Sequence, residues 1–130
     1  VLRFNPADPN VYDRFFQAVE KIKTVEQEQM AKATILEKKK PENMAEETLK
    51  ILRETDRKMK KILNEVFAND NDFDRLVQGV NLMAVGGNGE RVITNLLGAL
   101  MPIMEQGAKD FISGETNTAK LNREQRRAMQ

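Results

Sequence analysis

The stretch from Val92 to Met104 reads VITNLLGALMPIM and contains no charged residue. On a helical wheel its apolar side chains point to nearly every side instead of forming one stripe. A single neighbouring helix cannot cover such a helix, so it must lie at the centre of a small bundle or at a contact between molecules. The stretch therefore predicts a helical fold organised around its most apolar helix.

A long charged segment near the start of the chain has the spacing of an amphipathic helix. From Val11 to about residue 37, apolar residues recur at steps of three and four. Asp8 as the N-cap and Pro9 at the first helical position mark its start, and Pro41 stops it. Few large apolar residues follow Glu26, so we expect the far half to project beyond the core or to contact a neighbouring subunit.

A second amphipathic segment follows after a short connection. We expect Asn43 to cap it and the helix to reach about Phe67, with Thr55 and Asp56 interrupting its apolar stripe. Because the connection is short, the two segments are expected to form an antiparallel hairpin.

A third helix is expected from Phe73 to Met83, after a polar turn at residues 69–72. The sequence Gly86-Gly87-Asn88-Gly89 ends it, and we interpret Gly86, Gly87 and Gly89 as a hinge between helices.

The central apolar helix is expected from about Glu90 to Ile112, with a kink or a break one turn before Pro102 and an end at Ser113–Gly114. The fold class is therefore all-α, a small bundle of about four helices in which two long charged helices accompany an apolar helical pair. Residues 1–114 form the helical domain, and residues 115–130 are expected to be a flexible basic tail because they carry few large apolar side chains.

Composition argues against several kinds of chemistry. The 130 residues include no His and no Cys, so the commonest general base, thiolate nucleophiles and the usual zinc ligands are missing, and Ser113 is the only serine. We expect a protein that is not an enzyme and that uses no cofactor or metal. The net charge of +1 gives no overall attraction to nucleic acid or to a membrane, and the apolar run is shorter than a membrane span of about 20 residues. A cytoplasmic location is expected.

Two short motifs have an ordinary structural explanation. Asp70, Asp72 and Asp74 resemble the opening of a calcium loop, but Arg75 and Asn81 stand where its glycine and bidentate glutamate belong, so helix capping is favoured. The glycine cluster at 86–89 resembles a phosphate-binding loop, but no strand precedes it and no Lys-Ser/Thr follows it, so a hinge is favoured.

Basic residues gather in three places. Two of these, Lys38–Lys40 and Arg57–Lys61, lie in helices that also carry many glutamates, and we interpret them as solvated faces. The third, in the tail, comprises Lys120, Arg123, Arg126 and Arg127, and it has no aromatic residue for stacking on bases. These patterns therefore argue against nucleic acid as a partner.

The remaining signal is the amount of apolar surface in the last two helices, which exceeds what the two charged helices can cover. Either these residues are ordinary core, or they bind a partner. Methionine suits a surface that accepts varied apolar partners. The partner-binding candidates are Leu76, Val80, Met83, Leu96, Leu97, Leu100, Met101 and Met104. The same excess predicts a homo-oligomer.

The order of these elements is similar to that of a known family. FNPADPN enters the first helix, two charged helices follow, then VNLMAVGGNGERVITNLLGALMPIM, and the end reads LNREQRRAMQ. This layout resembles the tail assembly chaperones of long-tailed bacteriophages and related prophages. The resemblance implies a helical protein that coats the apolar tape-measure protein, keeps it soluble and helps to recruit tail-tube subunits. It assigns no individual residue.

Two alternatives remain open at this level. The protein could be a small helical adaptor or regulator that binds nucleic acid through its basic clusters, which a salt-dependent shift of DNA would favour. It could also be a helical structural component of the virion, which its presence in finished particles would favour.

Overall fold

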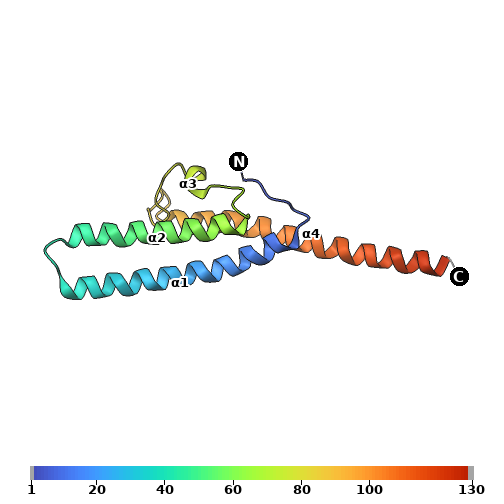
Figure 1. The fold of residues 1–130 in the computed structure, drawn as a ribbon, viewed down its shortest axis with the longest axis horizontal. Coiled ribbons are helices and arrows are strands. Elements are labelled where there is room, and N and C mark those ends of the chain that lie inside the picture. Colours follow the sequence, from blue (N-terminus) through green and yellow to red (C-terminus); the bar gives the residue numbers. More distant parts are fainter. Residues whose placement is uncertain (1, 129–130) are drawn as a thin grey trace.

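The computed structural model describes the backbone of residues 2–128 and the side chains of residues 2–114. The fold is all-α, as predicted, and the described residues contain no β-strand. The helices are α1 (Pro9–Lys39), α2 (Met44–Val66), α3 (Phe73–Leu76) and α4 (Val92–Ala128) (Figure 1).

Helix α1 begins and ends as its sequence predicts. The side chain of Asp8 accepts a hydrogen bond from the backbone N–H of Asn10 at 3.0 Å, and Pro9 is the first helical residue. At the other end Lys40 adopts the left-handed conformation, with φ 46°, and its N–H bonds to the carbonyl of Leu36 before Pro41.

Helices α1 and α2 form the predicted antiparallel hairpin. Phe15 and Ile22 of α1 are fully buried with Met59 and Leu63 of α2 in the core. Asn43 occupies the N-cap of α2, but its side chain donates to Glu47 at 3.3 Å instead of capping a backbone N–H. None of residues 26–54 is buried, so the tip of the hairpin extends beyond the core, as expected.

The third helix is much shorter than predicted. It ends at Leu76, not at Met83, because Gln78 and Gly79 take positive φ values of 54° and 74° and the N–H of Gly79 bonds back to the carbonyl of Asp74 at 2.7 Å. Residues 77–91 form turns instead. The expected pair of apolar helices is therefore one apolar helix preceded by a loop.

Helix α4 is longer than predicted, and the expected end at Ser113–Gly114 is wrong. The helix continues to Ala128, because a glycine within a helix costs only about 1 kcal/mol and the following segment is rich in helix-forming Ala, Lys, Leu, Glu and Arg. The expected break near Pro102 is also absent. Pro102 has no N–H to bond with the carbonyl of Gly98, but both residues are exposed, so water can hydrate that carbonyl.

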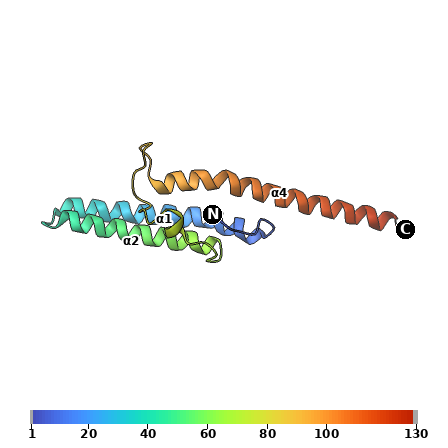
Figure 2. The ribbon, with the colours of Figure 1, turned by 90° about the horizontal axis from the view of Figure 1, so that it is seen from above.

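Helix α4 forms a second layer beside the hairpin and packs against α1 (Figure 2). Its start lies near the middle of α1, and Gly107 contacts Tyr12 close to the start of α1, so the two helices are antiparallel. The last turns of α4 extend past the base of the hairpin (Figure 1). The division of the chain into a helical domain and a flexible tail of residues 115–130 stays a prediction. The side chains of the basic cluster in this tail lie outside the described part of the chain.

Candidate partner-binding surface

The structure divides the eight partner-binding candidates among three environments. Three of them belong to the core, since Met83 and Leu100 are buried and Met104 is fully inaccessible. Those three side chains are not available to a partner in this conformation, because they are packed in the common hydrophobic core. Three others on α4, namely Leu96, Leu97 and Met101, are half-buried. The last two are exposed: Leu76 is the final residue of α3, and Val80 lies in the turns that follow it.

Helix α4 carries two exposed isoleucines that the sequence analysis did not select. Ile103 is 51% exposed and Ile112 is 64% exposed. Ile103 lies seven residues after Leu96, which places both side chains along one edge of the buried stripe of α4. Ile112 lies nine residues, or about two and a half turns, after Ile103, so it lies along the opposite edge with Leu97 and Met101. Helical spacing measured from Leu96 would have identified Ile103, whereas the buried positions could be recognised only once α1 was seen to pack on α4. The candidate surface therefore consists of the two edges that border the buried face of α4. Its residues, which together we call the α4 flank surface, are Leu96 and Ile103 on one edge and Leu97, Met101 and Ile112 on the other.

The loop with the three hinge candidates is closed by hydrogen bonds across its base. The N–H of Val92 donates to the carbonyl of Ala84 at 2.8 Å, that of Ile93 to Leu82 at 2.9 Å, and that of Gly86 to Glu90 at 2.7 Å. Of the three glycines only Gly89 has a positive φ, of 81°. Any swing of α4 at this loop would have to break these bonds, and the hinge role stays a prediction.

The same bonds bear on the phosphate-binding interpretation of the loop. An anion at a helix N-terminus needs free backbone N–H groups. Here the N–H groups of the first two residues of α4 already bond to Ala84 and Leu82. The geometry therefore favours a structural loop.

A polar cluster on α2 is a feature that the sequence analysis interpreted wrongly. Lys60, assigned to a solvated face, is only 7% exposed, and its Nζ donates to Asp74 Oδ1 at 2.6 Å and to Asp56 Oδ2 at 3.0 Å. The other oxygen of Asp56 accepts the N–H of Leu82 at 2.8 Å. Asp56 interrupts the apolar stripe because it fastens the loop after α3 to α2 and orients Lys60, which in turn fastens α3 through Asp74.

The surroundings of Lys60 stabilise its charged form. Burial by itself lowers the pKa of Lys60, but the hydrogen bonds to Asp74 and Asp56 outweigh it and raise the pKa above 10.5. Nothing in the pattern of charges along α2 distinguishes Lys60 from Lys58, which pairs with Glu28 on the surface at 3.4 Å. Lys60 differs from Lys58 only because the segment that follows α2 folds over it and places Asp74 beside its Nζ.

The aspartates of the calcium-like motif have separate tasks. Asp72 caps α3 by accepting the N–H of Asp74 at 3.1 Å, as the capping interpretation predicts. Asp74 instead pairs with Lys60. Among the described residues, no three acidic side chains converge as a metal site would require.

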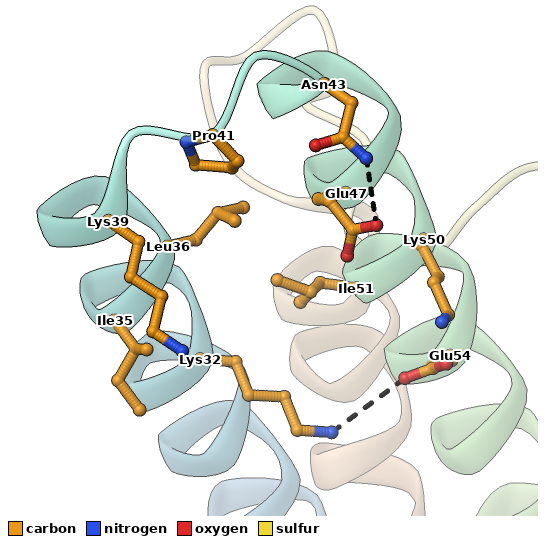
Figure 3. Close-up of a pocket in the computed structure, with 10 residues that line it drawn as sticks. All are labelled: Lys32, Ile35, Leu36, Lys39, Pro41, Asn43, Glu47, Lys50, Ile51 and Glu54. Atoms are coloured by element: carbon orange, nitrogen blue, oxygen red, sulfur yellow. Dashed lines mark hydrogen bonds and ion pairs between the residues drawn. The ribbon is translucent and has the colours of Figure 1, made fainter.

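An open groove lies between the ends of α1 and α2 (Figure 3). Leu36 and Ile51 face each other across it, and the ion pair of Lys32 with Glu54, at 3.8 Å, crosses one end. Its volume is about 440 Å³. The groove is a consequence of the hairpin tip having no third helix.

Comparison of the chain with models of known protein families, with curated proteins and with solved structures finds no match. Within its described part, no helix has both the length and the apolar character needed to cross a membrane. The arrangement of α4 is therefore the observation from which a function has to be argued.

Proposed function

We propose that this protein is a non-enzymatic tail assembly chaperone of a long-tailed bacteriophage or prophage. It binds apolar helical segments of the tape-measure protein in the host bacterial cytoplasm and keeps that client soluble for assembly of the tail tube. The observation that supports this proposal is that α4, the most apolar helix, packs on α1 along one side and leaves the α4 flank surface half-buried or exposed.

The energetics of such a surface suit binding to an apolar client. Burying one Leu, Ile or Met side chain contributes about 1.5–3 kcal/mol. Ile103 and Ile112 are the most exposed members of the surface, and Met101 adds an unbranched side chain that adapts to partners of different shape. A contact of this kind favours apolar helices as a class and does not require one sequence.

The same surface is expected to associate with a second copy when no client is present. We propose a homo-oligomer, a dimer or a larger ring at micromolar concentration, with the tail-tube protein as a further partner in assembly. Sedimentation measured over that concentration range tests the oligomer. A strict monomer would contradict it.

The chaperone proposal is tested by co-expression with the tape-measure protein. The soluble fraction of the client is measured with the wild type, with no chaperone, and with Ile103→Glu or Leu97→Glu. A charge on the α4 flank surface must lose its water when the client binds, at a cost of several kcal/mol, so both variants should lose solubilisation.

Leu49→Glu is the matched control, since Leu49 is 64% exposed on α2 and outside the α4 flank surface. It should solubilise the client as the wild type does. Each variant counts only if circular dichroism shows its helical content unchanged. If the wild type leaves the client as insoluble as no chaperone does, the proposal is wrong. A salt-dependent shift of DNA would then favour an adaptor that binds nucleic acid. Presence of the protein in finished particles would favour a structural component of the virion.

A further inference from the structure

Helix α4 is held on the hairpin by apolar contacts. Ile93, Leu100 and Met104 are buried in the common core. Within residues 92–111, no side-chain hydrogen bond or ion pair joins α4 to α1 or α2. Apolar packing is non-directional, so another helix with suitable side chains could make the same contacts.

One position of this contact selects a small residue. A Cβ atom built on Gly107 would lie 2.7 Å from the ring of Tyr12, which is closer than real Cβ atoms approach. Tyr12 cannot easily give way, because it is buried and its hydroxyl donates to the carbonyl of Pro6 at 2.7 Å. A helix in this place must therefore carry glycine opposite Tyr12.

The two ends of α4 differ in how firmly they are attached. The first turn is fastened to residues 82–84 by the backbone bonds of Val92 and Ile93. Pro102 then removes the hydrogen bond to the carbonyl of Gly98, which makes the turn from Gly98 to Pro102 the weakest point of α4. The part after Pro102 can leave α1 while the first turn stays in place.

We infer that the face of α1 around Tyr12 is an exchangeable seat for a helix, at which a client helix replaces the part of α4 that follows Pro102. The partner is a helix with apolar side chains toward α1 and glycine opposite Tyr12. This inference rests on the proposed function for the identity of the client. It also gives a role to Met104. This side chain is buried while α4 packs on α1, and exchange would expose it to the client.

Exchange is tested with a labelled synthetic peptide of residues 92–128 and the full chain, by fluorescence anisotropy. In the wild type the chain's own α4 competes at an effective concentration in the millimolar range, so the peptide should bind weakly. Gly107→Ala in the chain forces its own α4 away from Tyr12, and the peptide, which keeps glycine, should bind at least tenfold more tightly. Gly98→Ala is the matched control, since a Cβ there would meet nothing within 4 Å beyond the backbone of its own helix, and it should not strengthen binding.

A covalent lock shows whether the peptide occupies this seat. Ala7 and Asp110 line one pocket between the start of α1 and α4, and the chain has no Cys, so a bis-maleimide would join only an Ala7→Cys, Asp110→Cys pair. Placed in the Gly107→Ala chain, the linked form should lose peptide binding and the unlinked form should keep it, both with helical content checked by circular dichroism.

Equal binding by the linked and unlinked forms would overturn the inference, as would a Gly107→Ala chain that binds no better than the wild type. The client is absent from this experiment. If the peptide experiment fails, the exchangeable seat is rejected, and the chaperone proposal is still tested by co-expression. If the co-expression experiment fails, the chaperone proposal is rejected, and the exchangeable seat is not affected.

Discussion

The hairpin with α3 and the helix α4 are held by different kinds of contact. Asp56, Lys60 and Asp74 fasten α3 and its following loop to α2, and buried Asn71 bonds to the backbone of Arg3. Helix α4, after its first turn, relies on side chains such as Leu100 and Met104 that have no directional partner. Buried polar groups tolerate one geometry because an unmade bond is costly, whereas apolar contacts can rearrange. The hairpin with α3 is therefore the rigid region, and α4 is the adaptable one.

Asp56→Ala should break the rigid region and have the largest effect on stability. Removing this carboxylate leaves the N–H of Leu82 unpaired and takes one of two partners from Lys60. Removing one partner of a buried pair costs about 3–5 kcal/mol, and we expect about 3 kcal/mol because Asp74 remains. Urea unfolding measures the loss. Glu54→Ala, which breaks the exposed pair with Lys32, should lower the free energy of unfolding by no more than about 1 kcal/mol. Equal losses in the two variants would contradict the idea that the buried polar contacts make this region rigid.

Gly107→Ala and Gly98→Ala should have effects of opposite sign within α4. Overpacking against Tyr12 costs about 1–3 kcal/mol, and most of this range exceeds the gain in helix propensity of about 1 kcal/mol. At Gly98, with open space around the new methyl group, only the gain should appear. Thermal unfolding of both variants checks this. A stabilising Gly107→Ala would show that α4 can move away from α1 at no cost.

Alkaline pH should weaken the rigid region more than α4. Because the pKa of Lys60 is raised in the folded state, its stabilising contribution is complete below about 10.5 and is lost as pH rises through the raised value. Lys60→Met removes this group, so the stability of the wild type relative to Lys60→Met should fall as the pH is raised from neutral to above 10.5. A constant difference between the two unfolding curves across that range would show that the pair contributes no pH dependence.

Deleting residues 115–130 should have the smallest effect. In the structure residues 115–128 continue α4 past the base of the hairpin, and the sequence of the deleted segment offers few large apolar side chains for packing. The free energy of unfolding should change by less than about 0.5 kcal/mol. A fall in melting temperature of many degrees would show that this segment docks and that the domain does not end at residue 114.

The sequence by itself determined the elements whose signals are local. The start of α1 follows from Asp8 and Pro9, its end from the approach to Pro41, and the all-α class from periodicity, because capping and helical spacing act within a few residues. It also identified the apolar helix, and with it the region where a partner is proposed to bind.

Contacts between distant segments were decided only by the tertiary structure. Met104 and Ile103 are neighbours in one apolar run, yet α1 covers the first and leaves the second half exposed. Lys60 looks like any surface lysine until Asp74 is brought beside it, and Gly107 looks like a helix weakness until Tyr12 fills the space. Burial depends on which surfaces meet, and a pattern along one chain does not carry that information.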